Sequence, residues 1–269
     1  MVAKDANLPN AAIVRGEARD LDHDRYLAAL LAPAPARDAL MTLAAFHGEI
    51  ARIPTSVREA AMGAIRLQWW RDTLGDAAAA PAGSPVADRL RHDIESGALP
   101  IAEVISIIDA YETLLQPDAL ADAAAIDAFL DASQGAAFRL SACILGAEEG
   151  SARGIVGAAA QAYGRVQLLR AMPLLLAKGH NPFARDPVQE WAPVVQPILA
   201  ATRQSLGEVR RLMPVASLTL RTAILPVALV EPYLAALERL GSRIASEQAG
   251  ISPLSRVWRI YVARRRGRL

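Results

Sequence analysis

The stretch RDALMTLAAFHGEIARIPTSVREAAMGAIRLQWWRDTL (37–74) decides the fold of this chain. In its first part, apolar side chains recur at three- and four-residue steps, the period of an amphipathic helix: Leu40, Leu43, Phe46 and Ile50. Pro54 is expected to end that helix, because proline lacks an amide donor and clashes with the preceding turn. The sequence therefore predicts two long helices separated by a tight break.

The second helix of this pair is expected to begin at Ser56, where the hydroxyl can accept from a free backbone amide. Glu59 follows three residues later, which completes a capping box. Met62, Ile65 and Trp69 then fall on one apolar stripe, so we expect this helix to bury a large aromatic load and to keep a charged flank.

The rest of the chain continues the helical pattern. Hydrophobic residues make up 53% of the 269 residues and aromatic residues only 5%, so the apolar mass is mainly aliphatic, rich in the strong helix formers alanine and leucine. No stretch alternates convincingly with period two. We predict an all-α protein with an irregular arm over residues 1–19 and one helical domain over residues 20–269. In the helix expected over 151–176, three glycines suggest close backbone packing or a cavity wall, and Pro173 should kink or break it.

Composition also excludes several classes of protein. The formal net charge is +1, which argues against a general nucleic-acid binder. Cys143 is the only cysteine, so an internal disulfide or a cysteine-based zinc site is excluded, and we expect its side chain in the core. No apolar stretch has the length of a signal peptide or of a membrane span, so a soluble, cytoplasmic protein is expected.

The acidic residues and histidines form no convincing metal site. Asp20, Asp22 and Asp24 alternate as in a calcium loop, but arginine and leucine replace the glycine and glutamate that such a loop needs. The simpler interpretation is a capped start of a helix over 25–31. Two further pairs are spaced by four residues, Asp118 with Asp122 and Asp127 with Asp131, and we interpret them as parts of solvated helix faces. The four histidines are far apart in the sequence.

Several segments resemble the squalene/phytoene synthase family: DRYLAALLAP (24–33), AAFHGEIARI (44–53), IRLQWW (65–70) and AYGRVQLLRAMPLLL (162–176). With LPVALVEPYLAAL (225–237) and the last helix, the resemblance covers nearly the whole chain. It implies an isoprenoid (terpenoid) synthase fold, a single helical bundle with a central cavity.

Enzymes of that family join two prenyl diphosphates head to head, and magnesium ions bridge the leaving diphosphate to aspartate pairs on two facing helices. The resemblance places one pair in the segment that here holds Ala51, Arg52 and Thr55, and the other at Ala171 and Leu175. Both pairs of acids are missing, so the resemblance implies no catalytic residue, no bound metal and no cofactor.

The FxxE pattern at Phe46–Glu49 and the RLQWW run (66–70) resemble the motif-poor branch of the family, which contains the mitochondrial complex I assembly factor. This implies a non-catalytic assembly or binding protein whose partners are subunits or assembly intermediates of respiratory complex I. An isoprenoid or lipid is a candidate ligand, and nucleic acid is not a partner. The alternative is an active prenyl diphosphate transferase that holds Mg²⁺ with displaced carboxylates such as Glu49 or Asp72.

Two sets of residues are candidates for binding. The first would line a degenerate pocket, unless its tryptophan belongs to the core and its charges form structural ion pairs: Glu49, Arg52, Arg66, Gln68, Trp69, Asp72, Gln167 and Arg170. The second lies in the tail 253–269, which has six arginines and no acidic residue. It would form a membrane or partner surface, peripheral on the inner membrane, unless this helix docks on the core with a solvated basic end: Trp258, Tyr261, Arg264, Arg265, Arg266 and Arg268.

Overall fold

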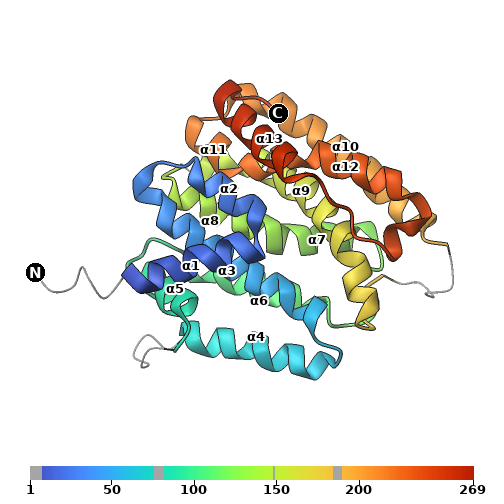
Figure 1. The fold of residues 1–269 in the computed structure, drawn as a ribbon, viewed down its shortest axis with the longest axis horizontal. Coiled ribbons are helices and arrows are strands. Elements are labelled where there is room, and N and C mark those ends of the chain that lie inside the picture. The colour runs from blue at the N-terminus through green and yellow to red at the C-terminus, as the bar shows by residue number, and fades with distance from the viewer. Residues whose placement is uncertain (1–7, 76–81, 148, 184–189) are drawn as a thin grey trace, which may run out of the picture.

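The structure is a computed structural model that describes residues 8–75, 82–147, 149–183 and 190–269 (Figure 1). Within those ranges the chain is helical and contains no strand, so the all-α prediction is confirmed. The first half consists of α1 (Leu8–Leu21), α2 (His23–Leu30), α3 (Ala34–Ser56), α4 (Ala60–Gly75), α5 (Pro85–Glu95) and α6 (Ile101–Thr113).

The second half begins with a helix that is interrupted by a π-helical turn, and it ends with a series of helices joined by 3-10 turns. The first group is α7 (Ala123–Leu130), η1 (Asp131–Gly135) and α8 (Ala136–Ile144), followed by α9 (Glu149–Ala177) and α10 (Ala192–Leu212). The second is η2 (Met213–Val215), α11 (Leu218–Ala223), η3 (Leu225–Leu229), α12 (Val230–Leu240), η4 (Gly241–Ala245) and α13 (Pro253–Arg266).

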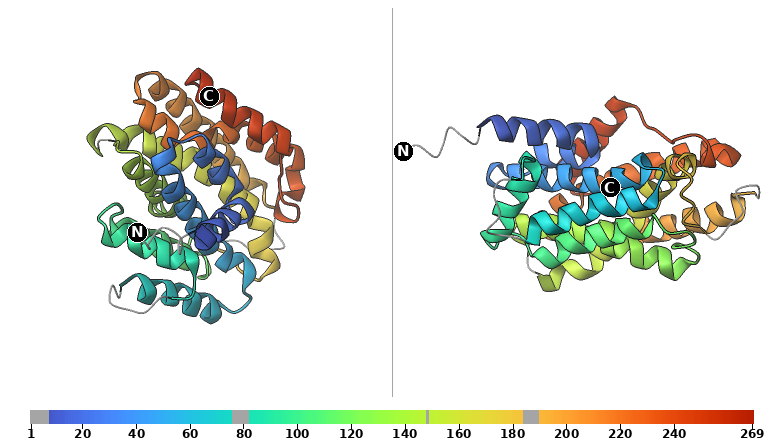
Figure 2. Two further views of the ribbon diagram at one scale, coloured as in Figure 1. Left: turned by 60° about the vertical axis from the view of Figure 1, so that its left-hand side comes forward. Right: turned by 90° about the horizontal axis from the view of Figure 1, so that it is seen from below.

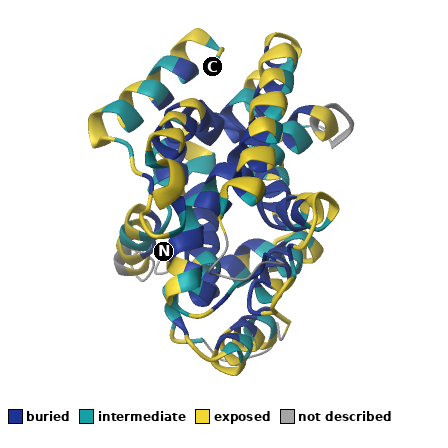
Figure 3. Cartoon of the chain, turned by 90° about the vertical axis from the view of Figure 1, so that its right-hand side faces the viewer, coloured by how far each residue is buried: buried dark blue, intermediate teal, exposed yellow. Residues whose placement is uncertain are grey.

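Helices α3 and α9 run through the middle of the bundle. Helices α10, α12 and α13 cover one side and α4 lies on the opposite side, as two further views confirm (Figures 1 and 2). Buried residues gather along the middle helices, and exposed residues lie on the outer ones (Figure 3). The largest fully buried side chains include Phe46 of α3 and Tyr163 of α9. The segments 44–53 and 162–176, which carry the family resemblance, thus lie in the central helices of the fold.

The break between the first two long helices differs from the expectation. Helix α3 passes through Pro54 and ends two residues later at Ser56. A proline in the last turn is tolerated here because few backbone bonds follow it. The Ser56 hydroxyl donates back to the carbonyl of Ile53 at 3.0 Å, so it does not cap α4, which begins at Ala60. The capping-box prediction is therefore wrong.

The expected irregular arm is also corrected. Residues 8–19 belong to α1, while residues 1–7 lie outside the described residues. Helix α1 packs along α3, and over residues 10–21, whose burial the structure describes, its buried stripe consists of Val14 and Ala18. Such a narrow stripe of small side chains gives little periodicity, which is why the sequence pattern did not reveal the helix.

Two predictions about burial are wrong. Met62, Ile65 and Trp69 of α4 are 46%, 62% and 41% exposed, because α4 instead turns Leu67, Trp70 and Leu74 toward the core. The Cys143 side chain is exposed rather than buried.

Helix α9 also continues through Pro173 to Ala177 instead of breaking after Arg170.

Candidate functional site

A cavity of about 260 Å³ lies among α2, α3, α6, α7, α9, α12 and α13. The segment where α1 ends and α2 begins lines it with three acidic side chains, Asp20, Asp22 and Asp24. Asp22 caps α2 by accepting from the backbone N–H of Arg25 at 3.1 Å, so the predicted capped helix start is confirmed. The same short segment also supplies the centre of two buried polar networks.

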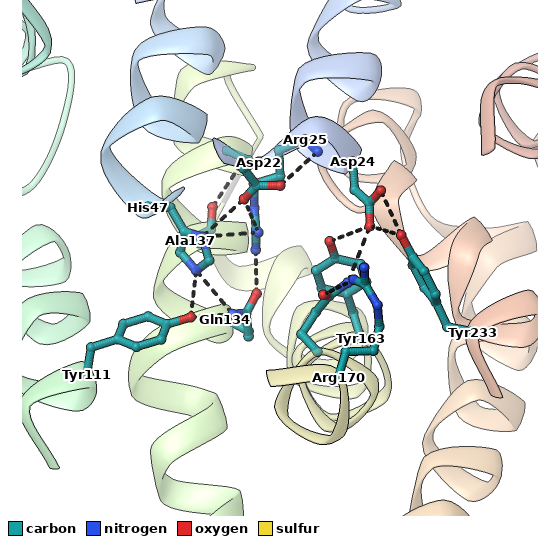
Figure 4. Close-up of polar contacts among 12 residues, drawn as sticks. Asp22, Asp24, Arg25, His47, Tyr111, Gln134, Ala137, Tyr163, Arg170 and Tyr233 are labelled. Atoms are coloured by element: carbon teal, nitrogen blue, oxygen red, sulfur yellow. Dashed lines mark hydrogen bonds and ion pairs between the residues drawn. The ribbon is translucent and has the colours of Figure 1, made fainter. Parts of the chain in front are cut away.

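The first network surrounds Asp22 and joins α2, α3, α6 and η1 (Figure 4). Arg25 donates to the Asp22 carboxylate at 2.8 Å and to the side-chain carbonyl of Gln134 at 2.6 Å. His47 of α3 lies 3.1 Å from the same Asp22 oxygen through Nδ1. Its Nε2 lies 3.2 Å from the Tyr111 hydroxyl and 3.1 Å from the Gln134 amide nitrogen. Each of these side chains thus has at least two partners inside the protein.

The hydrogen bonds fix the protonation state of His47. A carboxylate can only accept, so Nδ1 must carry the proton that faces Asp22, and Nε2 is left as an acceptor for Tyr111 or Gln134. Burial lowers the pKa of His47, and the nearby Arg25 charge lowers it further. Burial alone would raise the pKa of Asp22, but Arg25 and His47 hold it well below its usual range. The network therefore contains a neutral imidazole and an ion pair.

The second network surrounds Asp24, on the other side of α2 (Figure 4). Tyr163 of α9 donates to Oδ2 at 3.0 Å, and the Tyr233 hydroxyl of α12 lies 2.9 Å from the same oxygen. Gln167 donates to it at 3.3 Å, and Arg256 Nε of α13 lies 3.0 Å from Oδ1. Burial raises the pKa of both tyrosines, so their hydroxyls remain protonated donors.

The π-helical turn η1 places Gln134 in the first network. It separates α7 from α8, and the cavity-facing Gln134 is only 3% exposed. A π-helical turn adds a residue to the helical path and therefore rotates the following side chains relative to an α-helix. Gly164 of α9 faces this turn so closely that a Cβ there would lie 3.0 Å from the Gln134 side chain. This contact explains one of the three glycines for which close packing was expected.

The positions at which the sequence resemblance places the two aspartate pairs lie on the cavity wall. Ala51 and Thr55 line it from α3, and Ala171 and Leu175 line it from α9. In both helices the spacing of four residues places the two positions on one face. Methyl, hydroxyl and isobutyl groups are not magnesium ligands of the kind a diphosphate site requires. These four side chains therefore do not fit a magnesium–diphosphate cluster. Over the described part of the chain, no three His, Cys, Asp or Glu side chains are grouped to hold a metal ion.

Two of the eight pocket candidates from the sequence line this cavity. Gln167 is in the Asp24 network, and Arg170 donates to Gln167 at 2.5 Å and to the carbonyl of Ala249 at 2.9 Å. The Arg170 guanidinium also lies 4.1 Å from the centre of the Tyr233 ring, in a cation–π contact.

Four other candidates line a separate groove of about 880 Å³ between α1, α3 and α4: Glu49, Arg52, Arg66 and Trp69. Arg52 therefore does not point into the central cavity, where the sequence had placed its charge. The remaining two, Gln68 and Asp72, are exposed on α4 and hydrogen-bonded to each other at 2.7 Å. The structure thus divides the predicted pocket between the cavity, the groove and the surface of α4.

Glu49 faces Glu17 of α1 at the edge of this groove. Burial raises the pKa of Glu49 to about 7, and the neighbouring Glu17 carboxyl contributes to the shift. Burial raises the pKa of Glu17 as well. The two carboxyls therefore titrate as a coupled pair.

We expect Glu49→Gln to flatten the pH dependence of stability between about pH 4.5 and 7. The folded pKa of Glu49 lies above its ordinary value of 4.5, so its contribution is complete below that value and is lost as pH rises through about 7. Glutamine stays neutral and removes this loss. Urea unfolding at several pH values measures the slope, and Glu17→Gln should change it in the same direction. An unchanged slope in Glu49→Gln would contradict the assignment.

Sequence reasoning missed most of the two networks. Asp22 and Asp24 had been considered only as a calcium loop or a helix cap. Tyr111, Gln134 and Tyr233 were part of apolar helical patterns and carried no separate signal. The one available clue was the position of Tyr163 and Gln167 in the segment that resembles the family, one turn apart on the helix that should face the cavity.

The geometry defines the class of protein: a helical bundle of the isoprenoid-synthase type with a polar central cavity. The squalene synthase HpnC from Alicyclobacillus acidocaldarius has the same fold, with a TM-score of 0.68 and 18% sequence identity, over 88% of this chain and 95% of that one. Residues 18–186 match the model of the squalene/phytoene synthase family, and the chain belongs to this family.

Among characterised proteins, the chain is similar to assembly factor 6 of the NADH dehydrogenase (ubiquinone) complex I. The identity is 31% for the protein from Bos taurus and 30% for that from Homo sapiens, in both cases over 156 residues, or 58% of this chain. The match spans about half of those relatives, 47% of their length.

Proposed function

We propose that this chain is a non-catalytic member of its family that acts as an assembly or binding factor for respiratory complex I. The observation that carries the proposal is the cavity wall. Ala51 and Thr55 on α3 and Ala171 and Leu175 on α9 stand where two facing carboxylate pairs would have to bind magnesium. Without those ligands, the charge that develops on a leaving diphosphate has no metal to stabilise it.

The size of the cavity supports the same conclusion. Pockets that enclose one drug-sized molecule measure about 300–1,000 Å³, whereas this cavity measures about 260 Å³. Head-to-head condensation requires two prenyl diphosphates at once. The largest ligand that the cavity suits is therefore a single small isoprenoid or lipid. Its polar end would lie near the networks and its chain along Leu114, Phe129 and Leu168.

The alternative of an active transferase with displaced acids has weaker support. Asp22 and Asp24 reach the cavity from the same helix start, and both are already engaged by arginine, histidine or tyrosine side chains. Glu49 lies in the groove and Asp72 on the surface of α4. Two acidic clusters that face each other across the cavity are what a diphosphate site requires, and these four residues do not provide them.

The part of the proposal that concerns complex I is supported by the similarity to assembly factor 6. The groove between α3 and α4 is the surface that we assign to a protein partner. Its exposed Ile65 and Trp69 are bordered by Arg52 and Arg66, which suits an apolar surface with acidic neighbours.

Incubation with farnesyl or geranylgeranyl diphosphate and Mg²⁺ is expected to release no diphosphate above the rate without protein, because the metal ligands are missing. Release is measured with a coupled diphosphate assay. A squalene synthase of the same family serves as the positive control. Release that disappears in Glu49→Gln or Asp24→Asn would overturn the non-catalytic assignment.

The role in assembly requires a separate test in cells. Deleting the gene from a host that respires through complex I is expected to lower the amount of assembled complex on native gels, and the wild-type gene should restore it. The double variant Ile65→Ser/Trp69→Ser, altered only on the exposed side of α4, should fail to restore it although the protein accumulates normally. Normal amounts of complex I in the deletion strain would contradict this part of the proposal.

A further inference from the structure

Helix α13 has two faces of different character. Its inner face includes the buried Ile260 and Ala263, and it is tied to the centre of the bundle by Arg256, which reaches Asp24. Its outer face carries a continuous apolar stripe at helical spacing, with exposed fractions of 78%, 48%, 62% and 45%: Leu254, Val257, Trp258 and Tyr261. The helix is thus held firmly on the body while a large apolar face points away from it.

The six arginines of the tail divide in the same way. Arg256 pairs with Asp24, Arg259 lies 3.4 Å from Glu231, and Arg264 donates to the carbonyl of Leu31 at 3.4 Å. The other three have no acidic partner among the described residues: Arg265, Arg266 and Arg268. Arg265 comes four residues after Tyr261 and therefore lies on the same face of the helix as the apolar stripe.

We propose that the outer face of α13 docks on an anionic lipid surface. Indole and phenol rings prefer the interface between headgroups and acyl chains, since one part of each ring system is apolar and the other can form hydrogen bonds. The three unpaired arginines at the same end of the helix would meet the lipid phosphates, and each basic residue near such a surface adds measurably to binding. Charge and apolar area thus act together on one preformed helix.

The structure favours a surface-bound helix over other modes of binding. No described helix is long and apolar enough to cross a membrane, whereas α13 combines an outer apolar face with a basic end, the pattern of a helix that lies in the interface. A nucleic acid would be met by the arginines alone and would leave the apolar stripe in water. This inference does not depend on the role in complex I assembly.

Sedimentation with vesicles tests the proposal. The full chain is expected to bind vesicles of 70% phosphatidylcholine and 30% phosphatidylglycerol, to bind pure phosphatidylcholine much more weakly, and to release at high salt. Arg265→Gln/Arg266→Gln/Arg268→Gln should weaken binding about 100-fold, since each basic residue contributes about fivefold. Trp258→Ser/Tyr261→Ser should weaken it at least tenfold, because the interfacial apolar area is lost.

A matched control uses α4, on the opposite side of the molecule (Figure 1). Ile65 is as exposed as Trp258, at 62%, and Arg66 is exposed beside it. Ile65→Ser/Arg66→Gln should therefore bind vesicles like the wild type. All substituted side chains are exposed, and thermal unfolding verifies that each variant is folded. Equal binding to neutral and anionic vesicles, equal binding by the α13 variants and the wild type, or binding to RNA without binding to vesicles would overturn the proposal.

Discussion

Replacing Asp24 with alanine is expected to destabilise the fold by about 3–5 kcal/mol, the typical effect of removing one partner from a buried ion pair. The carboxylate is 5% exposed and is contacted by two tyrosines and by Arg256. Without it, two buried hydroxyls and the partly buried Arg256 guanidinium are left with too few acceptors. Urea unfolding followed by circular dichroism measures the change in the free energy of unfolding.

Asp109→Ala is the matched control for this measurement. Asp109 accepts from Arg71 at 2.6 Å, a shorter distance than any in the Asp24 network, but its side chain is 56% exposed. Exposed pairs contribute only about 0–1 kcal/mol, so this variant should unfold nearly like the wild type. An equal loss of unfolding free energy in the two variants would show that burial does not make the contacts of Asp24 more stabilising than an exposed ion pair.

The second large effect is expected at Gly48, which lies between His47 and Glu49 on α3. A Cβ at this position would lie 2.6 Å from the Cβ of Leu21 and 3.0 Å from its backbone carbon. Helix α1 must therefore move for any larger residue, and Gly48→Ala should destabilise the protein by about 1–3 kcal/mol. Because Leu21 precedes Asp22, the same shift should disturb the cavity, which NMR shifts of the His47 ring would report.

Gly157→Ala provides the opposite case. Nothing lies within 4 Å of the Cβ that this change would add in α9. Alanine is favoured over glycine in a helix by about 0.5–1 kcal/mol, so the variant should be slightly more stable than the wild type. If Gly48→Ala were equally harmless, the close crossing of α1 and α3 would not be a constraint on this fold.

The helical pattern of the sequence predicted most of the fold. The last helix, for example, was expected in the tail 253–269 and spans Pro253–Arg266. Weak or ambiguous patterns misled the prediction in two ways. Over residues 10–21, helix α1 buries Val14 and Ala18 alone, which gives a weak period. Helix α4 carries apolar residues on both of its sides, so that Trp69 and Trp70 could not be assigned to surface and core from their spacing. Which side faces the core depends on neighbours that the local sequence does not contain.

The candidate site could be predicted only where local spacing was informative. The wall positions Ala171 and Leu175 followed from a recognisable helix segment. The polar networks did not, because their members come from separate helices and each is an ordinary residue in its own segment. Tyr233 lies in an apolar stretch, for example, and only the assembled bundle brings its hydroxyl to Asp24.

The Asp24 network also sets the order in which this protein can be completed. Tyr163 and Tyr233 follow Asp24 by 139 and 209 positions in the chain. On the ribosome, the first helices emerge long before these residues are synthesised, so the Asp24 carboxylate stays solvated while most of the polypeptide is made. Closing such distant contacts is slow. The amino-terminal helices can therefore reach their final packing only after α12 and α13 have been translated. A nascent chain arrested before Tyr233 should remain sensitive to proteases around α2.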